Sequence, residues 1–296
     1  MNKHIFTDNL TASLGALVSQ SNKFFAADLH SPSFTDLIIG TEINLPQINR
    51  ETTLEVTAHT PVGAMNTAIR IEKWLGPGYK TIIYHHGNNE RPFDYGWGAK
   101  NTFYNILAKA KKDFPANLMV VRAPFHDLPI RKYQKKMTSL ANFMAMLSVS
   151  VKMNECIISR LQEANASPVI TAGISLGGWV TNLHRSFFNS SDLYAPLLAG
   201  TLLAELFLIS KYSKLVAPMA LQQAETLREK LNFQKDYQRI TSNNVAPLLA
   251  RHDQFIQYDV QRNAYDGFPL TVLEAGHITG ALKTAALRNH MLKLLQ

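Results

Sequence analysis

The most informative part of the sequence for the fold is VITAGISLGG at residues 169–178. Four β-prone residues at 169–172 precede a G-x-S-x-G pattern in which Ser175 stands between Gly173 and Gly177, and a run typical of a helix follows to residue 187. A strand, a sharp turn and a helix in this order are what a nucleophile elbow requires. Glycine has no Cβ atom, so the chain can turn sharply there. We therefore predict that Ser175 is a nucleophile at the turn; a glycine-rich turn without chemistry is the alternative.

His277 is the predicted general base for that serine. A serine hydroxyl is a poor nucleophile unless a base takes its proton, and in this topology the acid and then the histidine follow later strands. His277 ends the run EAGH at 274–277, after a predicted strand at 270–273 and before a predicted helix at 281–295. That loop is expected at the carboxyl edge of the sheet, beside the elbow. An ordinary surface histidine is the alternative.

Asp253 is the predicted acid that orients the histidine. It follows a predicted strand at 245–250 and precedes His277 by 24 residues, enough for one helix and one strand. Asp259 and Asp266 are weaker candidates, because the first falls within the next predicted helix and the second precedes the last strand. Asp253 could alternatively be a helix N-cap, a position that aspartate favours.

The loop HHGNN at residues 85–89 is predicted to complete an oxyanion hole. It follows a predicted strand at 81–85, where the second backbone N–H of such a hole is expected. The first donor would be the backbone N–H of Leu176, directly after the nucleophile. The second would be that of Asn88, with Asn89 as the alternative. Three residues of this region are expected to contact the substrate: His86, Asn89 and Arg91.

Strands and helices alternate along residues 53–296. The predicted strands are at 53–59, 67–74, 81–85, 118–122, 169–172, 195–203, 245–250 and 270–273, and the predicted helices are at 9–27, 102–112, 139–164, 177–187 and 281–295. This alternation predicts an α/β fold with a mostly parallel sheet and helices on both faces. The first two strands are expected to form an antiparallel hairpin. Residues 205–242 contain two helical runs and no strand, which predicts a small helical insertion.

With these pieces together, the sequence resembles the α/β-hydrolase superfamily. The resemblance rests on His86-Gly87, the elbow around Ser175, Asp253 and Gly276-His277, and it covers residues 53–296. It implies an eight-stranded, mostly parallel sheet whose second strand is antiparallel. It also implies a helical cap, for which residues 205–242 are the candidate. Residues 1–52 would be an N-terminal extension packed on this core.

Composition is that of an ordinary globular protein. Hydrophobic residues make up 46% and charged residues 18% of the 296 residues. The single cysteine, Cys156, cannot form an internal disulfide, and no Cys/His cluster has the spacing of a zinc site. The N-terminal residues include no sustained apolar run, so neither a secretory signal nor a transmembrane segment is expected. We therefore expect a cytoplasmic protein; no feature indicates its oligomeric state.

The formal charge of +8 is concentrated between residues 100 and 152. No nucleic-acid-binding motif accompanies it, so no nucleic acid is expected as a partner. Within this region, residues 123–137 follow a predicted strand and carry four basic side chains: Arg131, Lys132, Lys135 and Lys136. They predict either a solvated helix face or a preference for an anionic substrate or partner.

These candidates predict a serine hydrolase that cleaves a carboxylic ester or a thioester through an acyl-enzyme on Ser175. Such chemistry needs no metal or organic cofactor, and the expected partner is a small-molecule or acyl substrate. A serine peptidase with the same residues is one alternative. A non-catalytic binding protein that keeps the fold is the other.

Overall fold

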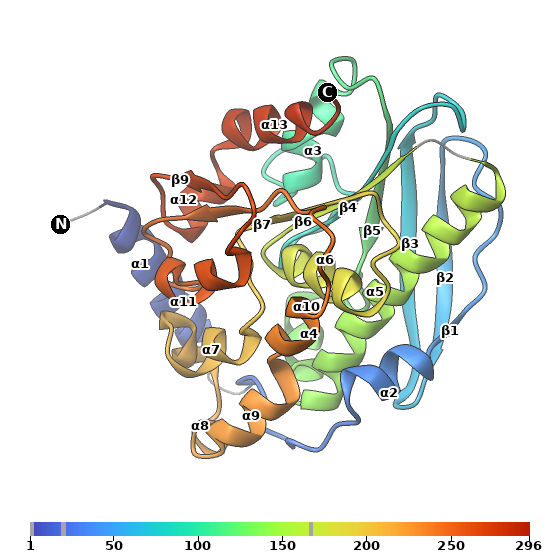
Figure 1. The fold of residues 1–296 in the computed structure, drawn as a ribbon. Helices are drawn as coiled ribbons and strands as arrows, with labels where there is room; N and C mark the ends of the chain where they lie inside the picture. Colours follow the sequence, from blue (N-terminus) through green and yellow to red (C-terminus); the bar gives the residue numbers. More distant parts are fainter. Residues whose placement is uncertain (1–2, 19–21, 166–167) are drawn as a thin grey trace.

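One twisted sheet runs through the molecule, with helices on both of its faces (Figure 1). The computed structural model describes residues 3–18, 22–165 and 168–296. Among these residues the strands are β1 (Glu42–Ile43), β2 (Thr52–Thr60), β3 (Gly63–Lys73), β4 (Thr81–His85), β5 (Asn117–Arg122), β6 (Val169–Ile174), β7 (Leu193–Leu197), β8 (Leu248–Ala250) and β9 (Thr271–Leu273). Their order in the sheet is β1-β2-β3-β5-β4-β6-β7-β8-β9.

The described residues contain thirteen α-helices and three 3₁₀ helices. The α-helices are α1 (Lys3–Val18), α2 (Phe34–Ile39), α3 (Thr102–Ile106), α4 (Ile130–Lys136), α5 (Leu140–Glu163), α6 (Leu176–Phe187), α7 (Leu203–Leu208), α8 (Pro218–Leu221), α9 (Ala224–Leu231), α10 (Gln234–Gln238), α11 (Tyr258–Gln261), α12 (His277–Ala281) and α13 (Thr284–Lys293). The 3₁₀ helices are η1 (Ala108–Ala110), η2 (Lys211–Leu215) and η3 (Arg262–Tyr265).

The strand pairing confirms a mostly parallel α/β sheet. From β5 through β9 every neighbouring pair is parallel, whereas β3 is antiparallel to both β2 and β5. The eight strands expected from the sequence correspond to β2–β9. The sheet described here has a ninth strand, β1, which pairs antiparallel with β2 at Glu42↔His59. This two-residue strand has little hydrophobic pattern of its own and forms because the edge of β2 offers unpaired backbone groups.

Two predicted elements end earlier than expected. The strand predicted at 195–203 is β7, which stops at Leu197 because Leu198 has a φ of 51° that no strand accommodates. The helix predicted at 102–112 is α3, which ends at Ile106 and passes into η1. Apolar residues continue beyond both ends, so hydrophobicity alone could not mark where either element stops.

The helix predicted at 9–27 begins earlier and is shorter than expected. Helix α1 spans Lys3–Val18, residues 19–21 of that prediction lie outside the described residues, and residues 22–27 are not helical. Instead, Phe24 forms a bridge with Val216, and its N–H donates to the carbonyl of Leu215 at 2.9 Å. The described N-terminal residues therefore lie along η2 and α12, at the edge where the parallel strands end (Figure 1).

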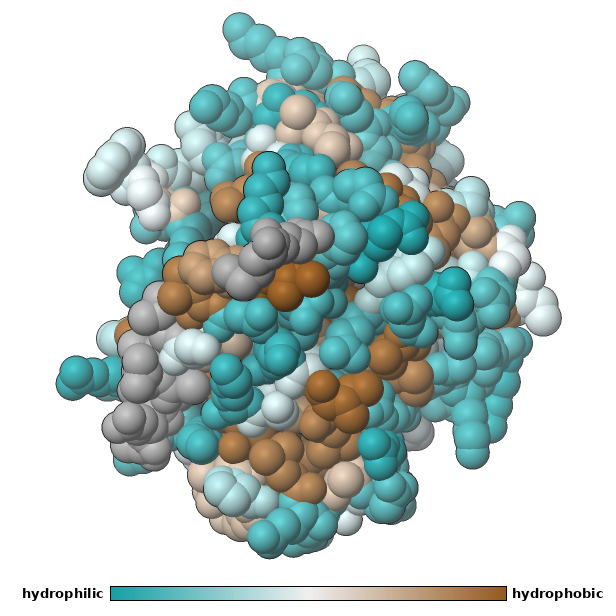
Figure 2. All heavy atoms as spheres, turned by 90° about the vertical axis from the view of Figure 1, so that its left-hand side faces the viewer, coloured by the Kyte–Doolittle hydropathy of each residue, from teal (hydrophilic) through white to brown (hydrophobic). Residues whose placement is uncertain are grey.

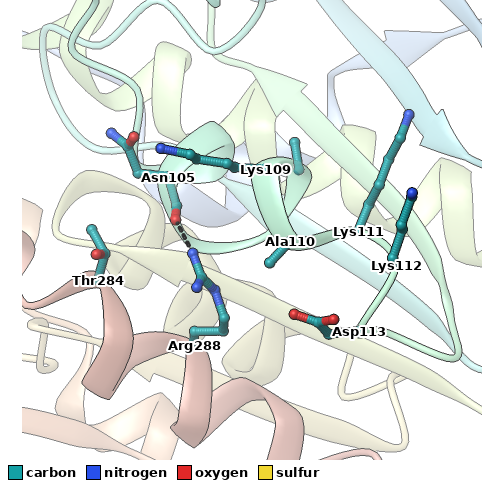
Figure 3. A pocket seen from close by; sticks show the side chains of 9 residues that line it. Asn105, Lys109, Ala110, Lys111, Lys112, Asp113, Thr284 and Arg288 are labelled. Carbon is teal, nitrogen blue, oxygen red and sulfur yellow. Dashed lines mark hydrogen bonds between the residues drawn. The ribbon is translucent and has the colours of Figure 1, made fainter.

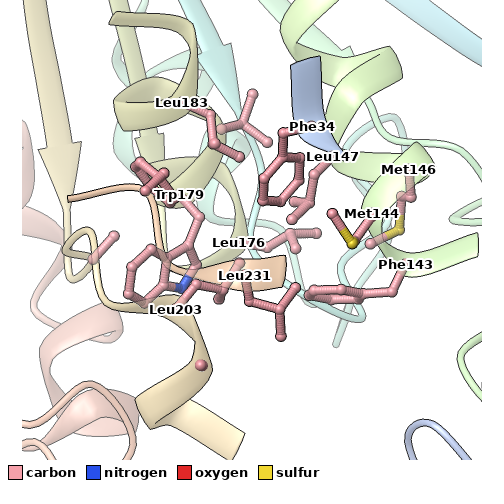
Figure 4. Packing of buried hydrophobic residues seen from close by; sticks show 14 of the residues in the cluster. Phe34, Phe143, Met144, Met146, Leu147, Leu176, Trp179, Leu183, Leu203 and Leu231 are labelled. Carbon is pink, nitrogen blue, oxygen red and sulfur yellow. The ribbon is translucent and has the colours of Figure 1, made fainter. Parts of the chain in front are cut away.

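The sheet has a separate apolar core on each face. Helices α3 and α13 cover one face and pack on alternate residues of the central strands, such as Ile82 and Leu118. The C-terminal half of α5 covers the other face, over Ile83 and Met119. The largest cluster continues from α5 and α6 into the helices between β7 and β8, with Trp179 among its largest buried side chains (Figure 4).

Within the described parts of the chain, no helix is long and apolar enough to cross a membrane. Figure 2 shows the face that carries α1, where hydrophilic side chains cover most of the surface and apolar ones form separate patches.

Candidate active site

The elbow around Ser175 is strained in the way its sequence predicts. Ser175 joins β6 to α6 with φ 53° and ψ −111°, and its N–H donates to the carbonyl of Leu197 at 2.8 Å. A non-glycine residue in such a conformation costs about 1–3 kcal/mol and persists only where its surroundings hold it in place. The conformation lifts the hydroxyl out of the turn, at the carboxyl edge of the sheet.

The two glycines of the elbow allow the backbone to pass at close range. A Cβ on Gly177 would lie 2.0 Å from the carbonyl oxygen of His85, and one on Gly173 would lie 2.3 Å from the carbonyl oxygen of Gly177. Neither distance can be relieved by moving a flexible side chain, because both partners are backbone atoms. Helix α6 can therefore begin directly above the end of β4 only with glycine at these positions.

Ser175, His277 and Asp253 are joined by two hydrogen bonds. The Nε2 atom of His277 lies 3.0 Å from Ser175 Oγ, and its Nδ1 atom lies 2.7 Å from Asp253 Oδ2. Asp253 Oδ1 also accepts the backbone N–H groups of Phe255 at 2.8 Å and Ile256 at 2.7 Å. A carboxylate can only accept, so Nδ1 carries the proton, and Nε2 of the neutral ring is free to accept from the serine hydroxyl.

The histidine and the aspartate of this series are both buried, with 3% of Asp253 and 8% of His277 exposed. Burial by itself lowers the pKa of His277, but the negative charge and hydrogen bond of Asp253 outweigh it, so the net effect is a raised pKa. His277 can therefore take up a proton more readily than a free imidazole.

The other acid candidates lie away from this group. Asp259 is on α11 with 88% of its side chain exposed, 3.8 Å from Arg262. Asp266 follows η3 and is exposed as well. Within the described residues, neither of them hydrogen-bonds to His277. The carboxylate that contacts the His277 ring is that of Asp253.

The two predicted oxyanion donors, Leu176 and Asn88, line the same cavity as Ser175. Leu176 is the first residue of α6, where a helix leaves its N–H groups without internal partners. Asn88 lies in the loop after β4. Among the described residues, no acceptor contacts the N–H of either one.

The side chain of Asn88 is held between two tyrosines that sequence reasoning did not connect with it. Its Nδ2 donates to the hydroxyl of Tyr212 at 3.0 Å, and its Oδ1 accepts from the hydroxyl of Tyr133 at 2.5 Å. Tyr212 comes from η2 and Tyr133 from the buried side of α4. Both tyrosines are too far along the chain, by 124 and 45 residues, for any local pattern to indicate these contacts.

The three residues predicted to contact the substrate have different positions. Asn89 lines the cavity with a φ of 59°, which asparagine tolerates better than most residues. His86 is buried behind the loop, where Nδ1 donates to the carbonyl of Gly87 at 2.7 Å and Nε2 accepts from the N–H of Ala123 at 3.0 Å. Arg91 is exposed and is not part of the cavity wall. The structure therefore brings only Asn89 to the cavity.

The cavity above Ser175 has a volume of about 480 Å³ and is lined by both apolar and polar side chains. The apolar ones include Phe24, Phe143, Trp179, Leu203, Leu206, Phe207 and Phe255. The polar ones include Asn89, Glu90, Lys100, Asn101, Asn105 and Thr284. Burial raises the pKa of the Glu90 carboxyl, whose Oε2 accepts the N–H of Thr102 at 2.8 Å.

A second hollow of about 660 Å³ lies between η1 and α13 and is markedly basic (Figure 3). Its walls include Lys109, Lys111, Lys112 and Arg288, with Asp113 as the acidic exception. Arg288 donates to the carbonyl of Asn105 at 2.7 Å and so holds the end of α3. This hollow contains no serine, cysteine or histidine that could act as a nucleophile or base.

The basic residues of α4 do not reach the cavity. Arg131, Lys132, Lys135 and Lys136 are exposed, while Tyr133 on the same helix points inward to Asn88. Within the described residues, no group of three or more histidine, cysteine, aspartate or glutamate side chains is placed to hold a metal ion.

Comparison with known proteins identifies the fold. No family model and no curated protein matches the chain. Among solved structures, an acylaminoacyl peptidase of Pyrococcus horikoshii is similar over 95% of this chain (TM-score 0.53, 12% identity). This chain spans only 42% of the length of that peptidase. An acetyl xylan esterase of Paenibacillus sp. R4 (TM-score 0.52, 12% identity) is similar over 95% of this chain and 94% of its own. An esterase of Pyrococcus furiosus (TM-score 0.52, 12% identity) is similar over 85% and 98%. The chain has the α/β-hydrolase fold.

Proposed function

We propose that this protein is a serine hydrolase that cleaves a carboxylic ester or a thioester through an acyl-enzyme on Ser175. The observation that carries the proposal is the unbroken series of hydrogen bonds from Asp253 through His277 to Ser175, which ends beneath a cavity. A nucleophile, a base and an acid that orients the base are the groups that acyl transfer requires.

In the first half of the reaction, Ser175 Oγ attacks the substrate carbonyl carbon while His277 Nε2 takes the hydroxyl proton. Asp253 keeps the proton on Nδ1 and stabilises the imidazolium that forms. The N–H groups of Leu176 and Asn88 bind the oxygen that becomes negative in the tetrahedral intermediate. The intermediate then collapses, His277 donates its proton to the leaving alcohol or thiol, and the acyl group remains on Ser175.

Water completes the cycle by the same route. His277 takes a proton from water, whose oxygen attacks the acyl carbon, and a second tetrahedral intermediate forms. As the bond to Ser175 Oγ breaks, His277 returns the proton to that oxygen, and the carboxylic acid leaves. The base must be neutral at both attacks, so turnover rises as the pH passes upward through the pKa of His277.

The cavity supports a small substrate with an apolar acyl group. A volume of about 480 Å³ falls within the range of small-molecule sites. Phe207 and Tyr212 from residues 205–242 form part of its wall, so we propose that this segment acts as a cap over the site. Phe24 from the N-terminal residues lines the same cavity, with its ring 5.3 Å from that of Phe207 and 5.6 Å from that of Tyr212. The names of the structural neighbours include esterases and a peptidase; the small volume of the cavity favours an ester over a polypeptide.

A fluorophosphonate probe and a substrate panel test the proposal. Purified protein should form an adduct on Ser175 and hydrolyse p-nitrophenyl esters or acyl thioesters. Ser175→Ala should abolish labelling and lower kcat by at least about 10⁴-fold. The matched control is Ser186→Ala on the same helix, whose hydroxyl donates only to the carbonyl of Asn182 and which should keep full activity.

Two results would contradict the proposal. Folded wild-type protein without an adduct on Ser175 would indicate a non-catalytic binding protein. Faster cleavage of aminoacyl amides than of esters or thioesters with the same acyl group would indicate a peptidase.

A further inference from the structure

Helix α1 carries a buried carboxylate that the proposed reaction does not use. Asp8 has no exposed surface, although it belongs to the N-terminal residues that precede the resemblance to the α/β-hydrolase superfamily. A buried carboxylate is costly unless hydrogen-bond donors surround it. The groups that donate hydrogen bonds to Asp8 therefore indicate its structural role.

All three donors are backbone N–H groups in the loops of the triad. Asp8 Oδ2 accepts from the N–H of His277 at 2.8 Å and from that of Gln254 at 3.2 Å. Asp8 Oδ1 accepts from the N–H of Ile278 at 3.0 Å. One carboxylate thus holds the histidine itself, its neighbour, and the residue that follows the acid Asp253.

The local sequence of the histidine loop requires an acceptor from elsewhere. His277 is the first residue of α12, and the residue before it, Gly276, has no side chain that could accept the free N–H groups of the first turn. A Cβ on Gly276 would lie 2.7 Å from Asp8 Oδ2, so glycine also makes room for this carboxylate.

A second contact fastens the same helix to the same loop. The Nδ1 atom of His4 lies 2.8 Å from Thr279 Oγ1, which also accepts the N–H of Gly276 at 2.9 Å. The ring of His4 stacks on that of His252 in the acid loop, with centroids 6.0 Å apart. Helix α1 therefore contacts both loops that carry the partners of Ser175.

From this geometry we infer that Asp8 is a positioning residue, which holds the backbone of His277 so that its ring reaches both Ser175 and Asp253. The inference rests on the proposed function, since it assigns Asp8 a part in that reaction. Without the carboxylate, three N–H groups in the interior would lose their acceptor, and the loop would shift to satisfy them.

The charge of Asp8 also acts on the imidazole. Besides Asp8, the charged group that acts on His277 is Asp253 in the acid loop. The charged and titratable neighbours of His4 on α1 are Lys3, Lys283, His252 and Asp8 itself. A negative charge favours the protonated ring, so Asp8 contributes to the raised pKa of His277, after Asp253. Replacing Asp8 by a neutral residue should lower that pKa.

The deciding measurement is the NMR titration of the His277 ring in wild type and in Asp8→Asn, with His277→Gln to assign the signal. Asparagine has the same shape but no charge and only one acceptor oxygen. We expect the pKa of His277 to fall by about half a unit or more. The kcat for an activated ester should fall by about 10-fold to 100-fold with little change in KM, and the acid limb of the pH profile should move to lower pH. Thr7→Ala, whose hydroxyl donates to Lys3 within the same helix, is the control and should change none of these.

The outcomes separate the two proposals. An unchanged His277 titration and unchanged kcat in a folded Asp8→Asn protein would overturn the inference, whatever the wild type does. The proposed function would be overturned if the wild-type protein neither reacted with the probe nor hydrolysed esters. If the titration of His277 still shifted in Asp8→Asn, the role of Asp8 in positioning His277 would stand. Thermal unfolding of each variant confirms that folded protein is compared.

Discussion

At the residue scale, Asn88 performs two tasks with different parts. Its backbone N–H is a proposed oxyanion donor, while its side chain is fixed between the hydroxyls of Tyr133 and Tyr212. Burial raises the pKa of Tyr212 to about 12, so its hydroxyl remains protonated at neutral pH. A hydrogen-bond donor that is fixed before the substrate arrives needs no reorganisation during the reaction. Such preorganised donors stabilise the transition state most effectively.

We therefore predict that Asn88→Ala slows turnover although it leaves the backbone N–H in place. The loop loses both side-chain hydrogen bonds, and kcat should fall by about 10-fold to 100-fold, less than the loss of an oxyanion donor itself. Steady-state kinetics on the best ester of the panel measures this. Tyr133→Phe, which removes one of the two bonds, should give a smaller loss in the same direction. A kcat within about twofold of wild type in both variants would show that the side chain does not hold the donor.

At the element scale, α6 links the elbow to the helices between β7 and β8. Its first turn follows Ser175, and near its other end Arg185 is fully buried. The guanidinium donates to the carbonyl oxygens of Tyr237 at 3.1 Å, Ile240 at 3.1 Å and Ser242 at 2.8 Å, and it lies 4.5 Å from the centre of the Tyr237 ring. One side chain thus fixes the return of the chain from the proposed cap to the sheet.

Arg185→Met should destabilise the protein strongly. Methionine fills similar space but leaves several buried carbonyl groups without a donor, so we expect the free energy of unfolding to fall by at least about 3 kcal/mol. Urea denaturation measures the change. Arg239→Met is the matched control, because the Arg239 side chain is 77% exposed and pairs with Asp236 one turn earlier; it should change stability by less than about 0.5 kcal/mol. Equal effects of the two substitutions would contradict this role of Arg185.

At the scale of the whole molecule, three buried histidines beneath the oxyanion loop couple stability to pH. The rings of His85 and His86 stack with centroids 4.9 Å apart, and His126 lies 4.5 Å from His86. Burial lowers the pKa of His85 to about 3 and that of His126 to about 4, and it also holds the pKa of His86 well below its usual range. In the unfolded chain all three would titrate near about 6.5.

The sign of the effect follows from proton uptake. Below about pH 6.5 these histidines bind protons in the unfolded chain but remain neutral in the folded protein. The free energy of unfolding therefore falls as the pH falls, by up to about 1.4 kcal/mol per pH unit for each histidine. His277, whose pKa is raised, works in the opposite direction, whereas burial also lowers the pKa of His184 and that of His290. We predict that the free energy of unfolding decreases by about 5 kcal/mol between pH 7.5 and pH 5.

Urea midpoints measured across this range test the prediction. His126→Asn removes one of the three groups and should reduce the pH dependence by about a third, whatever it does to stability at neutral pH. Parallel curves for the variant and the wild type would show that His126 is not held neutral in the folded protein.

Residue types and their order along the chain were enough to predict the elbow and the order of the proposed triad. Glycine at 173 and 177 admits a turn that any Cβ would block, and β-prone residues on one side with a helical run on the other leave few other conformations for Ser175. Parallel strands bring their carboxyl ends to one edge, so residues that follow separate strands, such as Asp253 and His277, meet there without being close in sequence. Steric limits depend on residue type and sheet topology depends on the order of the strands, and both can be recognised in the sequence.

The contacts that hold Ser175, His277 and Asp253 in place depend on packing between distant parts of the chain. Asp8 and His277 are 269 residues apart, and a helix, unlike a parallel sheet, has no pairing rule that places one of its side chains at a distant loop. The same holds for the tyrosines on Asn88 and for β1, whose two residues pair only because β2 has a free edge. His86 illustrates the reverse: a histidine beside the elbow suggests substrate contact, yet packing turned it inward, where its ring atoms satisfy two backbone groups. Whether a loop side chain points into the core or into the cavity depends on all the contacts and hydrogen bonds that it makes there. A local sequence pattern does not include those distant partners.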